Sequence, residues 1–350
     1  MRPIRGLTLV ESLVALSCSG VIIGLFAGAA RMLRPTNGEA ISIANEIEIG
    51  TAHAMYSWDW GGLQWAGHQS NFGLAMGNCG TYLSTIGCPP QMLLGRDSLG
   101  GEWGYYLSGG LCQGFPGSCG NWVAYIPNEF TLTNGVMGSW QFMQARSFHN
   151  YLNGRFYDEV YYAPNDLRTY GKASRYFNDA GEFSYPPNQP VWSSYVASPA
   201  SMWHPEVLRA PSDGGFRAPT TFPAAFERQA LFSAAYPDLK SLVFERNWNQ
   251  NPPASGQVLA GGTIPFFFNG GAASRPITLF YDGHVGYLSN KQAISDDAAL
   301  IAQGADGLWS RDTPLGADGY YAQWSVDSTR TNHSVLTTEG ILGRDILSAP

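Results

Sequence analysis

A pair of residues near the C-terminus could serve as an acid and a base. Asp282 and His284 are two positions apart, so on an extended strand their side chains point to the same side. Catalysis by such a pair also needs a nucleophile and an orienting group, and the sequence does not supply these together. Asp282-Gly283 is in addition the kind of dipeptide best suited to a tight hairpin turn. We therefore expect a structural turn here and no enzymatic activity.

Three further acids could bind calcium. Asp306, Asp312 and Asp318 occur within a short stretch, and calcium prefers carboxylate and carbonyl oxygens. The spacing is not that of an EF-hand loop, and the glycines that follow Asp306 and Asp318 make both positions typical turns. A calcium site and plain turns therefore stay open as alternatives, and the sequence indicates no other cofactor.

Four of the five cysteines lie close together in sequence rich in Gly, Pro and Ser: Cys79, Cys88, Cys112 and Cys119. If this part of the chain lies outside the cytoplasm, an even set of this kind predicts a disulfide framework. Three pairings can be drawn, of which we favour the two local bonds, Cys79 with Cys88 and Cys112 with Cys119. Zinc is the rival, but the chain has no Cys-x-x-Cys pair.

The composition excludes some partners. The chain has 350 residues, of which 44% are hydrophobic, so it can bury a core. Only 13% are charged, about half of the roughly 25% usual in soluble proteins. The formal net charge is -7 and the pI is about 5.3, which argues against nucleic acid, because binding to phosphates needs clustered Lys and Arg.

The N-terminus joins a basic leader to a long apolar run. Residues 1–6 contain two arginines, and residues 7–34 are apolar over more than the ~20 residues that cross a bilayer. Glu11 stands near the start of this run, where a charge is costly. A secretory signal peptide, cleaved after Ala29, or a plain membrane anchor would fit the run. Neither accounts for the carboxylate.

A second helix and a β-rich body should follow. Pro35 and Gly38 interrupt the first segment, and an amphipathic helix is predicted within residues 35–60, beginning at Glu39. Its apolar stripe should lie against a sheet; the stripe consists of Ile41, Ala44, Ile47, Thr51, Met55 and Trp58. Residues 61–350 alternate short β-prone runs with clusters of Gly, Pro, Asn and Ser. Within them, residues 276–289 predict a hairpin with a two-residue turn.

The stretch from Arg5 to Glu11 resembles the processing motif of type IV prepilins and pseudopilins. The resemblance implies cleavage between Gly6 and Leu7, methylation of the new amino terminus at Leu7, and a role for Glu11 in assembly. The new α-amine would be largely protonated at neutral pH. If it meets the Glu11 carboxylate of a neighbouring subunit, both charges are neutralised and the axial register is set.

Three other stretches resemble parts of the same group of prepilin-like proteins: Glu48–Tyr56, Arg209–Asp213 and Ile277–Val285. The last resembles a C-terminal processing-associated domain that is named for a histidine, nine residues and Asp-Gly. Two positions depart from the pattern. Ala210 replaces the usual cysteine, and Ala272 stands where the name-giving histidine would be, so the role of that histidine does not carry over.

The resemblance implies a pilin-like α+β fold, in which a long N-terminal transmembrane and amphipathic helix packs on an antiparallel β-sheet with large Gly/Pro-rich loops. It also implies a structural subunit of a type IV pilus-like filament or of a type II secretion-type pseudopilus. The expected partners are prepilin peptidase and copies of itself or related pilins. The expected location is the inner membrane before assembly, and afterwards an extracytoplasmic or cell-surface filament.

A function of another class stays open, namely a membrane-tethered or secreted module that binds glycans or surface polymers. Aromatic residues are frequent in stretches such as Met55–Trp60 and Gly101–Tyr106. Most such residues pack in cores or loops. Exposed tryptophan and tyrosine side chains would favour the binding module.

Overall fold

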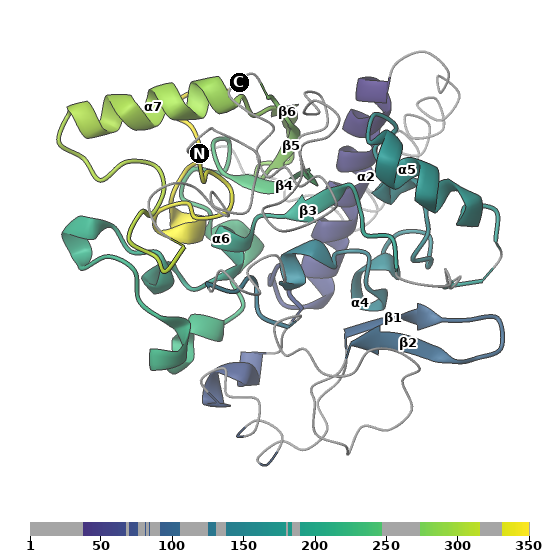
Figure 1. Ribbon diagram of the computed structural model, residues 1–350. Helices are drawn as coiled ribbons and strands as arrows, with labels where there is room; N and C mark the ends of the chain where they lie inside the picture. Colours follow the sequence, from purple (N-terminus) through teal and green to yellow (C-terminus); the bar gives the residue numbers. More distant parts are fainter. Residues whose placement is uncertain are drawn as a thin grey trace, which may run out of the picture.

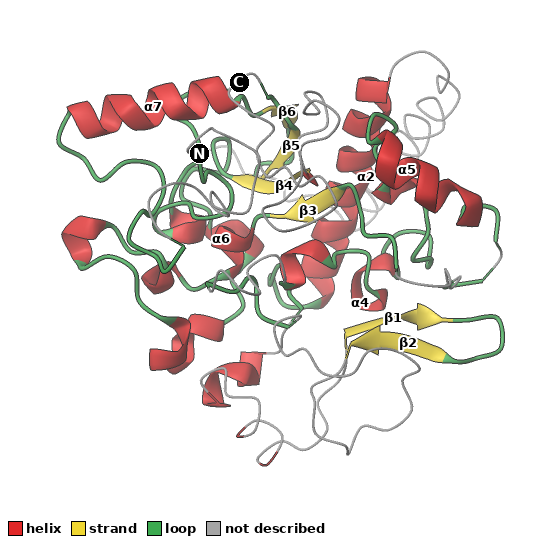
Figure 2. Cartoon of the chain, in the orientation of Figure 1, coloured by secondary structure: helices red, strands yellow, loops and turns green. Residues whose placement is uncertain are grey.

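The computed structural model describes residues 38–67, 70–75, 81, 84, 92–105, 125–130, 138–179, 181–183, 190–246, 274–315 and 331–349. These residues form short helices, two antiparallel sheets and long connecting loops (Figures 1 and 2). The α-helices are α2 (Gly38–Asp59), α4 (Arg146–His149), α5 (Leu167–Ala173), α6 (Pro199–Met202) and α7 (Asn290–Ala302). The described chain is therefore α+β.

The larger sheet has four antiparallel strands in the order β3-β4-β5-β6, which are β3 (Tyr195–Ala197), β4 (Ser241–Glu245), β5 (Ile277–Phe280) and β6 (Val285–Tyr287). Every residue of β3, β4 and β5 is buried. Helix α2 runs beside this sheet and contacts β5 and β6 (Figure 1). A separate hairpin, β1 (Met92–Arg96) with β2 (Glu102–Tyr105), contacts α4.

Short 3₁₀ helices occur throughout the loops: Ser70–Ala75, Ser139–Gln141, Glu159–Tyr161, Ser174–Tyr176, Pro205–Val207, Pro211–Asp213, Pro219–Thr221, Pro223–Phe226, Leu231–Ser233 and Gly340–Leu342. Four of them begin at a proline. Proline suits the first helical position because the missing N–H would have no partner there. The proline-rich stretch after β3 is thus ordered by local turns.

The expected pilin-like architecture is wrong. It requires a long N-terminal apolar helix that continues onto the sheet, whereas the described ranges contain no long apolar helix, and none of their helices could cross a membrane. Helix α2 has 22 residues and buries Glu46 and His53, which an apolar helix would not contain. Residues 7–34 lie outside the described part. The described residues form an α+β fold with antiparallel sheets.

Helix α2 begins one residue before the predicted start, but it buries a different face from the one predicted. Ile47 and Met55 are each 51% exposed and Trp58 is 88% exposed. The buried side chains recur at the same three- and four-residue intervals and are mostly small or polar: Ser42, Glu46, Ile49, Ala52, His53, Tyr56 and Ser57. Gly50 shows why, since a Cβ there would lie 3.0 Å from Leu279 of β5. Close approach of α2 to the sheet selects the face with small residues.

The predicted hairpin is present as β5–β6, with a different turn. Gly283 has φ +89°, whereas Asp282 is absent from the described non-glycine residues with positive φ. The Gly283 N–H donates to the Phe280 carbonyl at 3.0 Å, and the Phe280 N–H donates to the His284 carbonyl at 2.9 Å. The loop therefore has three residues with glycine in the left-handed position, a common alternative to the two-residue turn.

Candidate functional site

An exposed tryptophan at the end of α2 is the clearest candidate for ligand contact among the described residues. Trp60 follows the helix directly and is 49% exposed. Its ring stacks on that of Tyr56, with centroids 5.5 Å apart and planes inclined by 15°. Its indole N–H donates to the Tyr151 hydroxyl at 3.2 Å, and this hydroxyl donates to the Asp59 carboxylate at 3.1 Å. We call Asp59, Trp60 and Tyr151 the α2-end site.

The chain behind the α2-end site is fixed by hydrogen bonds to a distant segment. The Leu231 N–H donates to the Gly62 carbonyl at 2.8 Å, and the Gln64 N–H donates to the Gln229 carbonyl at 3.0 Å. Gly62 has φ +90°, and a Cβ there would lie 2.5 Å from the ring of Phe232, so this position needs glycine. Trp60 thus directly precedes a backbone turn that is held by hydrogen bonds.

Arg228 also contacts the residues of this turn and the aromatic rings next to it. Its guanidinium donates to the Tyr56 hydroxyl at 2.6 Å and to the Gln64 carbonyl at 2.9 Å. It also lies 5.2 Å from the centroid of the Trp60 ring. The cation therefore holds two aromatic rings and the backbone together, while about half of the Trp60 side chain stays exposed.

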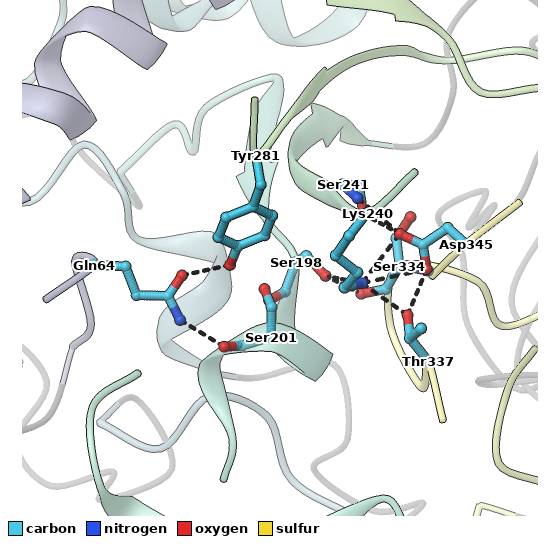
Figure 3. Close-up of polar contacts among 9 residues, drawn as sticks. All are labelled: Gln64, Ser198, Ser201, Lys240, Ser241, Tyr281, Ser334, Thr337 and Asp345. Atoms are coloured by element: carbon cyan, nitrogen blue, oxygen red, sulfur yellow. Dashed lines mark hydrogen bonds and ion pairs between the residues drawn. The ribbon is translucent and has the colours of Figure 1, made fainter. Parts of the chain in front are cut away.

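The sequence did not single out the buried group around Lys240 (Figure 3). Lys240 lies just before β4, and its ammonium donates to the Ser198 hydroxyl at 3.0 Å, to Thr337 at 2.8 Å and to the Asp345 carboxylate at 3.0 Å. A serine beside a lysine can be a nucleophile and its base. Here the Ser198 hydroxyl donates to the Ser334 carbonyl, and Lys240, Ser198 and Asp345 are all 0% exposed.

The charges of Lys240 and Asp345 indicate a structural role for the buried group. Burial lowers the pKa of Lys240, and Asp345 opposes that shift. Burial would by itself raise the pKa of Asp345, but Lys240 and the hydroxyls of Ser241 and Thr337 together lower it to about 2. Because the carboxylate is held ionised against the ammonium, the group is a buried ion pair that ties the C-terminal segment to the sheet.

Two carboxyl groups are buried between α2 and the sheet. Burial, followed by the charge of Glu245, raises the pKa of Glu46 well above its usual value. Burial raises the pKa of Glu245 to about 7, although its carboxylate accepts a hydrogen bond from the Ile277 N–H at 2.9 Å. One or both groups are therefore protonated near neutral pH. The periodicity of α2 gave no sign of this pair, because glutamate is usual on an exposed helix face.

Asp282 and His284 do meet, as a contact within the turn. The His284 Nδ1 lies 2.6 Å from the Asp282 carboxylate, and the imidazole stacks on Phe280 with centroids 4.4 Å apart. Both side chains are about one-third exposed. These contacts all lie within the turn, and the arrangement suits a hairpin.

Two of the predicted calcium ligands hold a neighbouring loop. Asp306 accepts a hydrogen bond from the Ser212 N–H at 3.3 Å, and Asp312 accepts one from the Phe216 N–H at 2.8 Å. Both carboxylates thus secure the turn after Arg209. Asp318 lies outside the described residues. Within the described ranges no three metal-ligating side chains come together, and calcium binding stays a prediction.

The other predicted positions lie outside the described residues: Gly6, Leu7, Glu11, Cys79, Cys88, Cys112 and Cys119. The processing site, the assembly residue and the disulfide framework therefore remain predictions from the sequence.

Comparison with known proteins adds no relative. No protein-family model, no curated protein and no solved structure matches the chain.

Proposed function

We propose that the protein is a processed subunit of a pilus-like filament or a secretion pseudopilus. The observation that carries this proposal is the N-terminal motif, in which a basic leader ends at Gly6 and Glu11 stands in an apolar run. Prepilin peptidase would remove the leader at the inner membrane, and copies of this chain or related pilins would assemble through residues 7–34. The mature subunit would then be extracytoplasmic or at the cell surface, with a structural and non-enzymatic role.

The electrostatics of assembly support the proposal. A carboxylate within the bilayer costs about 2.5 to 3.5 kcal/mol on insertion scales, so its retention calls for a compensating contact. Cleavage after Gly6 would create a cationic amine at Leu7, four residues before Glu11. The two charges on neighbouring subunits can compensate each other.

The outer face of α2 offers a surface for such an assembly. Ile47, Met55 and Trp58 are large, apolar and at least half exposed on this face, and exposed apolar patches mark protein contacts. The face belongs to the helix that follows residues 7–34 in the chain. A second copy of this protein is therefore the occupant that we propose for it.

Mass spectrometry and N-terminal sequencing of the mature protein test the processing step. We expect a methylated Leu7 as the first residue. A start at Ala30 would show a secreted protein, and an intact Met1 would show a plain anchor; either result would overturn the proposal.

Three substitutions at Glu11 test the assembly step. In Glu11→Ala and in the isosteric, neutral Glu11→Gln, cleaved protein should accumulate without entering filaments. Glu11→Asp is the matched control, because it keeps the charge, and it should retain part of the assembly. Normal filaments from Glu11→Gln would contradict the charge-pairing account.

A further inference from the structure

We propose that the α2-end site binds a carbohydrate, with the exposed part of the Trp60 ring packed on a sugar ring. The ligand class is a neutral polysaccharide or glycan chain. This inference goes beyond assembly and does not depend on it, because every residue that carries it lies in the described body.

The first argument is that the Trp60 ring is held in place before any ligand arrives. One face stacks on Tyr56, and the indole N–H is bonded to Tyr151 at 3.2 Å. Tyr151 in turn packs edge-on against Tyr56, with centroids 5.3 Å apart and planes at 69°. Binding usually costs entropy when a side chain is immobilised. A ring that is already immobile avoids most of that cost.

The second argument is the combination of a flat apolar face with polar groups at its edge. A sugar ring has C–H bonds on its faces and hydroxyl groups around its rim. Trp60 offers an aromatic face to the C–H side, while the Asp59 carboxylate and the Tyr151 hydroxyl lie beside it as hydrogen-bond partners. Binding sites for small polar molecules commonly pair apolar walls with a few placed polar groups.

The third argument concerns charge. Nucleic acid bases also stack on aromatic rings, but they bind in basic grooves that follow the phosphates. This chain has a net charge of -7, and an acid, Asp59, stands at the edge of the site. The nearby cation, Arg228, already donates to Tyr56 and to the Gln64 carbonyl. These charges favour an uncharged ligand.

Trp58 provides a natural comparison two residues away. It is 88% exposed, more than Trp60, and it lies on the outer face of α2 with Met55. Exposure alone would favour Trp58 as the contact residue. The contacts that orient its ring favour Trp60 instead. Comparing variants of the two tryptophans therefore shows whether binding depends on a pre-oriented ring or only on exposure.

The test is a titration of the full-length protein, in detergent, with two neutral probes. These are a hexasaccharide of β-1,4-linked glucose and a hexasaccharide of β-1,4-linked N-acetylglucosamine, followed by tryptophan fluorescence and calorimetry. We expect at least one of them to bind. Trp60→Ala should weaken that binding about tenfold or more, as is usual for a central aromatic contact, and Trp58→Ala should leave it within about twofold.

Two further variants guard against loss of folding. Tyr151→Phe removes the hydroxyl that orients the indole, and Asp59→Asn removes the charge at the rim; each should weaken binding about threefold while the unfolding temperature stays near that of the unmodified chain. The proposal is overturned if neither hexasaccharide binds at millimolar concentration. It is also overturned if Trp58→Ala weakens binding as much as Trp60→Ala, or if a polygalacturonate oligomer binds more tightly than both neutral probes.

Discussion

The titration of single buried residues sets how the stability of this protein depends on pH. Burial raises the pKa of Glu245 to about 7 in the folded chain, above the ordinary value of 4.5. Its folded-state pKa is raised, so the stability that it contributes is fully present below about pH 4.5 and is lost as the pH rises through about 7. Glu46 shifts in the same direction. Both acids therefore favour the folded state in mildly acidic solution.

Glu245→Gln should stabilise the protein at pH 8.5 by about 3 kcal/mol, because the amide cannot ionise and can still accept from the Ile277 N–H. At pH 5 the effect should be below about 1 kcal/mol. Chemical denaturation at the two pH values measures the difference. Glu227→Gln is the control, since Glu227 is exposed and its replacement should change little at either pH. Equal effects of Glu245→Gln at both pH values would refute the assigned pKa.

At the scale of elements, the orientation of α2 is open to direct test. Ile49 is 0% exposed and Ile47 is 51% exposed, although they are two residues apart on one helix. Ile49→Ala should cost about 2 to 4 kcal/mol, the usual loss for a buried Ile, and Ile47→Ala should cost less than about 0.5 kcal/mol in the monomer. Urea denaturation of both variants decides the matter. A larger loss for Ile47→Ala would mean that the predicted stripe faces the sheet after all.

The same helix shows how far sequence reasoning reaches. The periodicity located α2 to within one residue at its start, because proline and glycine mark that boundary. The periodicity predicted the wrong buried face of α2. Two sets of residues with the same spacing run along the helix, and apolar character alone does not distinguish the face that packs closely on the sheet from the exposed face. The close approach of Gly50 to Leu279 determines which face packs on the sheet. Leu279 lies in β5, so a pattern within the helix does not reveal it. The Asp-Gly pair located the β5–β6 hairpin, since turn chemistry is local, whereas the turn length was not predicted.

At the scale of the whole molecule, one ion pair joins distant parts of the chain. Lys240 and Asp345 are 105 positions apart and bind each other in the core. No local pattern could reveal this contact, nor the α2-end site, where Trp60 meets Tyr151 across 91 positions. Both depend on loops whose course the sequence leaves undetermined.

Lys240→Met should destabilise the protein by about 3 to 5 kcal/mol, because it leaves the Asp345 carboxylate buried without its cation. The double variant Lys240→Met/Asp345→Leu should recover a large part of that loss, since it removes both charges. Guanidinium denaturation of both proteins gives the comparison. If the double variant is less stable than the single one, the remaining hydroxyl groups, rather than the lone charge, account for the loss.

The position of Asp345 also affects the timing of folding during synthesis. The ribosome releases Lys240 long before Asp345, so the emerging chain first has a lysine at the start of β4 without its counter-ion. An unpaired ammonium keeps its hydration shell, which opposes burial of that end of the strand. The sheet can therefore close fully around this end of β4 only when the segment that contains Asp345 has been translated.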